Sequence, residues 1–158
     1  YFMIIIGIDP GLASWGYGII KKDKKVLKHI THGVIKTTPD MDIEERFLSI
    51  YNQIKKIIKE YEPNEASMER LFFFRNQRTV IQVSQVQGII MLAFKQKKIP
   101  LNIYTPLNIK NVITGDGKAK KVDIQKTVQK ILKMERHPTP DDAADGLAVA
   151  ICHSFKIQ

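Results

Sequence analysis

The segment Met-Ile-Ile-Ile-Gly-Ile-Asp-Pro-Gly, at residues 3–11, decides the fold. Residues 3–8 are almost entirely apolar and rich in β-branched side chains, which is typical of a strand buried on both faces of a sheet. Pro10 and Gly11 then end the strand in a turn. Such a strand needs a further layer on either side, so the segment predicts the central strand of a sheet that helices cover.

The segments outward from this strand complete a small α/β domain. Apolar runs predict strands at residues 16–20, 26–35, 66–68 and 101–104, and the polar Lys21–Lys24 is interpreted as a hairpin turn. Helical spacing and proline breaks predict helices at residues 42–60, 79–94 and 122–132, a short one from Pro106, and a last one at residues 140–155. We therefore expect an α/β fold in a single domain over residues 1–158, with a five-stranded mixed sheet and helices on both faces.

The composition is that of an ordinary globular protein. With 158 residues, 44% of them hydrophobic and 26% charged, the chain is neither a disordered tail nor a fibre. No apolar run approaches the roughly 20 residues of a membrane span, and the first residues do not resemble a signal peptide. Tyr1 and Phe2, which precede Met3, are interpreted as candidates for added residues. Cys152 is the only cysteine, which excludes an intrachain disulfide and fits a reducing cytoplasm.

The positive charge is concentrated in one part of the chain. The net charge is +9, which favours a polyanionic partner such as a nucleic acid. Residues 70–134 carry thirteen basic and two acidic residues, whereas the rest of the chain has a net charge of −2. If the basic residues served only to keep the protein soluble, we would expect them to be spread more evenly along the chain. We therefore interpret the basic segment as a DNA- or RNA-binding surface.

Two carboxylates stand at the ends of predicted strands. Asp9 ends the first strand and Glu69 ends the strand at residues 66–68. Taken singly, Asp9 fits an acid that caps the following turn, and Glu69 fits a solvated edge residue. A lone buried carboxylate is costly, so each acid must lie at the margin of the sheet or have a partner.

The last predicted helix begins with further acids. Thr139 as N-cap with Pro140 as first helical residue predicts a capping-box position for Asp142, and Asp141 suits the helix dipole. These structural roles do not explain Asp145, one turn further along a helix rich in alanine. Asp142 and Asp145 are three residues apart and therefore share a face, and the small residues around them allow the helix to lie close to the sheet.

Four acids from three segments are thus predicted to meet at one end of the sheet. In a protein this basic, an unpaired acidic cluster needs cations, and carboxylate oxygens select Mg²⁺ or Mn²⁺. Two such ions about 4 Å apart would clamp the attacking water and the leaving oxygen of a phosphodiester. The chain has no P-loop, no Cys/His zinc spacing and no Gly-x-Ser-x-Gly motif, so the residues indicate a nuclease.

The chain resembles the RuvC Holliday-junction resolvases, a branch of the RNase H-like nuclease superfamily, in order from Ile4 to His153. The specific motifs are Gly7-Ile8-Asp9-Pro10-Gly11 with Gly16-Tyr17-Gly18, then Glu69-Arg70-Leu71-Phe72-Phe73, and Asp142-Ala143-Ala144-Asp145. The resemblance implies a catalytic and metal-binding set of Asp9, Glu69, Asp142 and Asp145, with two Mg²⁺ per subunit and Mn²⁺ able to substitute. It also implies a homodimer that nicks two opposing strands of a four-way DNA junction and leaves 5′-phosphates, and it suggests a RuvA–RuvB-type branch-migration complex as a partner.

The same resemblance assigns DNA contacts. Phe72 would be the aromatic wedge at the junction, although Leu71–Phe74 also fits a core segment. Lys110 and Lys121 match family lysines that contact DNA. Lys118 and Lys120 are interpreted as further contacts to the DNA backbone, although each of these lysines also fits a solvated surface. Arg75 and Arg78 stand beside aromatic residues, a combination on which single-stranded bases stack. The uncharged helix at residues 79–94 has too much apolar surface for one buried face, and Gly88 would permit close approach of a second copy.

The chain departs from the usual family pattern in four places, none of them at the four carboxylates. These are Phe74 in place of a small residue, Ser84-Gln85-Val86-Gln87-Gly88, Asp123-Ile124 after Lys121, and Gly146 in place of alanine.

Two other functions stay open at this point: a non-catalytic junction-binding protein and a ribonuclease H that acts on RNA–DNA hybrids. An actin-like ATPase also begins with a strand and an Asp-x-Gly turn, but 158 residues leave no room for its second domain.

Overall fold

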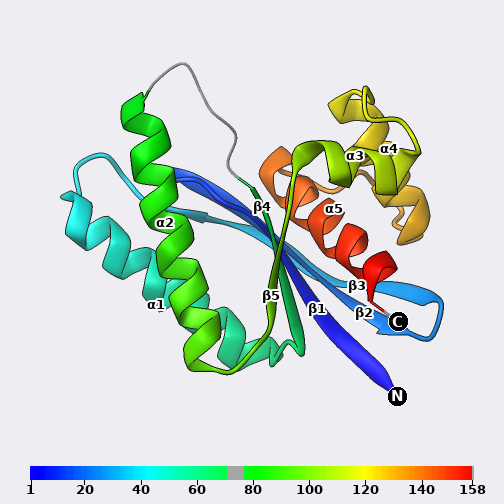
Figure 1. Cartoon of the computed structure of the whole chain (residues 1–158), viewed down its shortest axis with the longest axis horizontal. Coiled ribbons are helices and arrows are strands. Elements are labelled where there is room, and N and C mark those ends of the chain that lie inside the picture. The colour runs from blue at the N-terminus through cyan, green and yellow to red at the C-terminus, as the bar shows by residue number, and fades with distance from the viewer. Residues whose placement is uncertain (71–76, 158) are drawn as a thin grey trace.

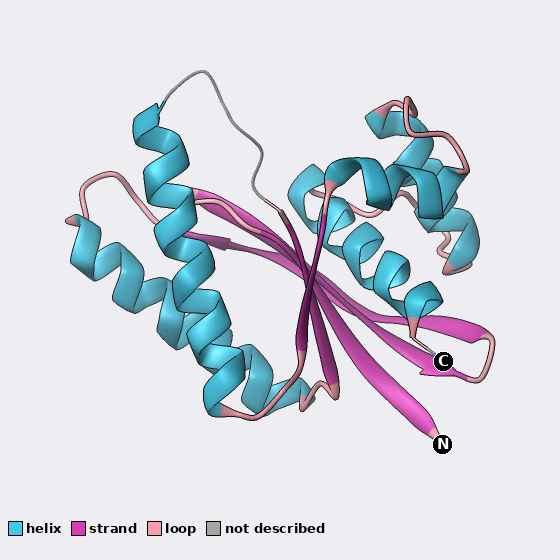
Figure 2. Cartoon of the chain, in the orientation of Figure 1, coloured by secondary structure: helices cyan, strands magenta, loops and turns pink. Residues whose placement is uncertain are grey.

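The computed structural model describes residues 1–70 and 77–157. The described part contains five strands and five helices, in the order expected from the sequence (Figures 1 and 2). They are β1 (Phe2–Asp9), β2 (Ser14–Asp23), β3 (Val26–Lys36), α1 (Ile43–Tyr61), β4 (Glu65–Glu69), α2 (Gln77–Gln96), β5 (Leu101–Tyr104), α3 (Pro106–Thr114), α4 (Lys121–Ile131) and α5 (Asp141–Lys156).

The sheet is mixed and has β1 at its centre. Its strand order is β3-β2-β1-β4-β5. β1 pairs antiparallel with β2 and parallel with β4, and β4 pairs parallel with β5. The expectation of a buried central strand is confirmed, because Ile5, Ile6 and Ile8 are fully buried.

Helices cover both faces of the sheet, as expected. α1 and α2 lie on one face, and α3, α4 and α5 lie on the other (Figures 1 and 2). The alternation of side chains along β1 divides the core: Ile6 and Ile8 belong to the cluster that contacts α1 and α2, whereas Ile5 belongs to the cluster that contains α5. Each face of the sheet therefore has a hydrophobic core of its own.

Glycines allow α5 to lie very close to the sheet. A Cβ atom at Gly7 would overlap the main chain of α5 at Gly146, and one at Gly16 would overlap the main chain at Asp142. Conversely, a Cβ atom at Gly146 would lie 2.6 Å from the Tyr17 main chain. Gly146 is thus required by packing, although a glycine inside a helix costs helix propensity.

The position of one turn differs from the expectation. The expected hairpin is present, but its turn lies at residues 24–25 and not over Lys21–Lys24, because β2 continues to Asp23. Lys22 stays in the strand because its Nζ donates to the main-chain carbonyls of Ser154 and Ile157, at the end of α5.

Within the described residues, no helix is both long enough and apolar enough to cross a membrane.

Candidate active site

Neighbouring strands bring Asp9 and Glu69 together on the face that α5 covers. Along β1, Ile5 faces α5, so the alternation of side chains places Asp9 on the same face. Along β4, the Ser67 hydroxyl donates to the main-chain carbonyl of Val149 in α5, and Glu69 follows two residues later. Gly7 pairs with Ser67 in the parallel register, so Asp9 and Glu69 end their strands side by side.

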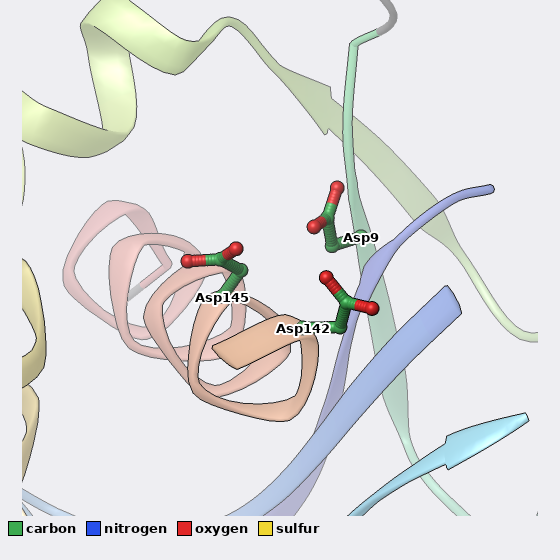
Figure 3. Close-up of side chains that lie close together, drawn as sticks. All are labelled: Asp9, Asp142 and Asp145. Carbon is green, nitrogen blue, oxygen red and sulfur yellow. The ribbon is translucent and has the colours of Figure 1, made fainter. Parts of the chain in front are cut away.

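The start of α5 supplies the other two acids. Carboxylate oxygens of Asp9, Asp142 and Asp145 all lie within 4.8 Å of one another (Figure 3). Asp142 is oriented by Ser14 of β2, whose hydroxyl donates to the Asp142 Oδ2 at 2.8 Å. The close packing of α5 on the sheet therefore also sets the spacing of these carboxylates.

The crowding of acids changes their protonation. Burial, the Glu69 carboxylate and the two α5 acids raise the pKa of Asp9 from 3.8 to about 9. Burial also raises the pKa of Glu69, against the opposing effect of its hydrogen bond with Asp9. We infer that the pair shares one proton, held by Asp9, when no cation is present.

Two lysines border the acids. The Lys121 Nζ lies 3.0 Å from the Asp145 Oδ2 and 3.7 Å from the Asp141 Oδ2. Together with Lys110, Lys121 lines a cavity of about 250 Å³ that reaches Glu69 and Asp145. Burial by itself would lower the pKa of Lys121. Its hydrogen bond to Asp145 and the charges of the nearby acids outweigh burial and raise the pKa, so the ammonium stays charged.

The comparisons with known proteins identify the family. The sequence model described as "Crossover junction endodeoxyribonuclease RuvC" matches residues 5–153. The chain belongs to the RuvC family. The resemblance inferred from the motifs is therefore confirmed, and with it the function class of a crossover junction endodeoxyribonuclease.

Individual members of the RuvC family match over almost the whole chain. The chain is 44% identical to the RuvC of Petrotoga mobilis, over 96% of this chain and 93% of that one. It is 50% identical to the RuvC of Fusobacterium nucleatum, over 96% of this chain and 80% of that one. The Thermus thermophilus RuvC structure in complex with a Holliday junction substrate superimposes with a TM-score of 0.92 at 28% identity, covering 98% of this chain and 94% of that one. These matches confirm the expected RNase H-like fold.

The DNA contacts expected for a RuvC protein fall in three places. Phe72 and Arg75 lie outside the described residues, as does Phe74. Arg78 is exposed in the first turn of α2. The lysines lie on α3, on α4 and in the connection between them, where Lys118 and Lys120 are exposed.

The expected capping box at α5 is wrong. The helix begins at Asp141, and its N-cap is Pro140, which makes no side-chain cap hydrogen bond. The Asp142 side chain accepts a hydrogen bond from Ser14 instead. The carboxylate is thus turned toward the sheet and the other acids, away from the helix N-terminus.

Two features of the structure were missed in the sequence. The ion pair between Lys121 and Asp145 depends on how α4 packs against α5, and no local pattern signals it. The second feature is a partly buried chain of hydrogen bonds, in which the buried His153 contacts the Tyr104 hydroxyl at 2.8 Å and the Glu65 carboxylate at 3.3 Å. A histidine in an apolar helix was its only signal.

Proposed function

We propose that the chain resolves four-way DNA junctions as a homodimer, with a nick in each of two opposing strands and 5′-phosphate ends. Hydrolysis takes place at Asp9, Glu69, Asp142 and Asp145, with two Mg²⁺ per subunit and Mn²⁺ able to substitute. The observation that carries this proposal is the approach of three carboxylates to within 4.8 Å beside two lysines, in a chain of the RuvC family.

The donor set fits hard divalent cations. Every candidate ligand is a carboxylate oxygen, the type that Mg²⁺ and Mn²⁺ prefer. The raised pKa of Asp9 reflects crowding that divalent ions would relieve by taking the place of the shared proton. When bound, two such ions would activate the attacking water and stabilise the leaving oxygen.

The side chains of the chain supply orientation and charge. Asp9 faces the α5 acids and hydrogen-bonds Glu69, so it links the two pairs of carboxylates. Ser14 fixes the rotamer of Asp142. Lys110 and Lys121 line the same cavity as Glu69 and Asp145, where their ammonium groups would neutralise a phosphodiester that approaches the acids.

The basic segment provides the DNA-binding surface of this proposal. Lys118, Lys120 and Lys121 lie on one short stretch around the start of α4, next to the cavity that Lys110 lines. We assign Arg75 and Arg78 to the phosphates near the crossover, and Phe72 to a base that is unstacked there. In this assignment, Phe72→Ala retains affinity for linear DNA but no longer changes the fluorescence of a base analogue at the crossover.

The exposed face of α2 supports the homodimer. Ile81 and Leu92 are 59% and 54% exposed, and Gly88 has no neighbouring atom within 4 Å of a Cβ position. Spacings of seven and four residues place these three positions on one helix face. A second copy of the same face would bury them around a two-fold axis that matches the symmetry of the junction.

Further partners follow from the same function. A nuclease that needs a mobile crossover would work beside a branch-migration motor of the RuvA–RuvB type. We place this work in the cytoplasm, because a chain with a single cysteine fits a reducing compartment.

The test is cleavage of a labelled synthetic four-way junction, beside a matched linear duplex and an RNA–DNA hybrid, with and without Mg²⁺. We expect paired symmetric nicks in the junction alone, and only with the metal. Junction binding without cuts would instead support a non-catalytic binding protein. Cleavage of the hybrid alone would support a ribonuclease H.

A matched pair of variants tests the site. Asp9→Asn is expected to abolish cleavage and to retain or tighten junction binding, because it removes negative charge near the phosphates. Asp23→Asn makes the same chemical change at the other end of the sheet, where Asp23 is exposed and pairs with Phe2, and should cleave normally. Cleavage by Asp9→Asn at the normal rate would contradict the assignment.

A further inference from the structure

The ammonium group of Lys121 is paired with Asp145, one of the carboxylates that would bind a divalent ion. Its Nζ lies 3.0 Å from the Asp145 Oδ2, and Asp145 belongs to the cluster of three carboxylates. Like any lysine, Lys121 carries an ammonium group that is charged near neutral pH. A divalent ion on Asp145 and the ammonium of Lys121 would compete for the same carboxylate and repel one another.

A second acid lies within reach of the same ammonium. Asp141 precedes Asp145 by four residues, so both carboxylates project from the same face of α5. The Asp141 Oδ2 lies 3.7 Å from the Lys121 Nζ. Asp141 is outside the cluster of three carboxylates, and its side chain is 65% exposed.

Gln125 holds Asp141 in this orientation. Gln125 follows Lys121 by four residues on α4, and its Nε2 donates to the Asp141 Oδ1 at 2.9 Å. The two helices therefore form a matched pair of ladders, Lys121 and Gln125 on α4 against Asp145 and Asp141 on α5. The second oxygen of Asp141 is left directed at the lysine.

We propose that Lys121 holds Asp145 until a divalent ion binds there, and that Asp141, positioned by Gln125, then receives the Lys121 ammonium. This inference rests on the proposed metal site. In the exchange the lysine moves by a rotation of its flexible side chain and does not leave the site. Its charge therefore stays beside the cavity where the phosphodiester would bind. Asp141 is a positioning residue for Lys121 and not a ligand of the ion.

The test measures Mn²⁺ binding to the whole chain without DNA, by the electron paramagnetic resonance signal of the free ion. Lys121→Met is expected to bind Mn²⁺ about tenfold more tightly than the original chain, because the competing cation is gone. Lys120→Met removes an equal charge one residue away and should change the affinity less. Asp141→Asn should bind Mn²⁺ about threefold more weakly, because the displaced lysine has no second carboxylate.

The double variant separates this exchange from a general effect of charge. If Asp141 acts through Lys121, then Asp141→Asn in the Lys121→Met background should change the affinity less than about twofold. An undiminished effect in that background, or equal effects of Lys120→Met and Lys121→Met, would overturn the proposal.

Asp9→Asn shows whether the ion binds at the carboxylates at all. Mn²⁺ binding that is insensitive to Asp9→Asn would refute the metal site itself, and the exchange with it.

Discussion

Replacement of Asp9 by asparagine should stabilise the metal-free protein while it removes activity. Asp9 has a pKa of about 9 in the folded protein and 3.8 as the reference for the unfolded chain. Near neutral pH the folded state therefore holds a proton that the unfolded state releases. Asparagine resembles the protonated acid, and its amide still donates to Glu69, so the variant avoids the free energy of keeping Asp9 protonated.

The magnitude follows from the displacement of the pKa. Each pH unit between the two pKa values is worth about 1.4 kcal/mol, so the stability gained near pH 7 is about 4 kcal/mol. In a domain of this size that difference raises the Tm by about 10 °C. The folded state binds more protons than the unfolded state, so the free energy of unfolding of the original chain falls as the pH rises from about 4 toward 9.

Urea unfolding of the original chain, Asp9→Asn and Asp23→Asn in EDTA, at several values between about pH 5 and 8, measures this effect. The advantage of Asp9→Asn should grow with pH by about 1.4 kcal/mol per unit, and Asp23→Asn should follow the original chain. Added Mg²⁺ should stabilise the original chain far more than Asp9→Asn, which narrows the difference. Equal stability of the original chain and Asp9→Asn across this range would refute the reasoning.

Three further predictions concern packing, assembly and the buried histidine. Gly146→Ala should lose about 2 kcal/mol in urea unfolding despite better helix propensity, whereas Gly88→Ala, with open space around it, should lose none in dilute protein. Ile81→Glu should shift the protein to monomers in analytical ultracentrifugation and leave monomer stability within about 0.5 kcal/mol; a persistent dimer would rule out this face. Tyr104→Phe should cost about 1 kcal/mol through the lost hydrogen bond to His153, and an unchanged urea midpoint would contradict that role.

The strands and the convergence of acids were predictable because they follow from the alternation of side chains. Residues 3–8 specify a buried strand, and the acid at its end continues the pattern that faces α5. The motifs around Glu69 and Asp142 then supplied the partners through the family resemblance. The structure adds the register, which pairs Gly7 with Ser67 and so sets Asp9 beside Glu69.

The errors have a common physical cause, because each involves a contact between residues far apart in the chain. Asp142 was expected to cap its own helix, but Ser14, 128 residues away, supplies the competing donor. Lys22 is a charged residue of the kind expected in a turn. It lies in a strand because its ammonium group donates to a main-chain carbonyl at the end of α5. The pairing of Lys121 with Asp145 was missed for the same reason, because it depends on the packing of two helices.

The division of the core by the sheet has a consequence for how this protein can change. α5, which carries Asp142 and Asp145, lies with α3 and α4 on one side of the sheet, whereas α1 and α2 lie on the other (Figure 1). Exposed substitutions on the α1 and α2 side can therefore accumulate without moving the carboxylates, provided that Gln87 of α2 is kept, because its Nε2 donates to the Glu69 main-chain carbonyl. Assembly and substrate shape could diverge in evolution while the chemistry is preserved, and an engineer could randomise the outer side of α2 as a separate module.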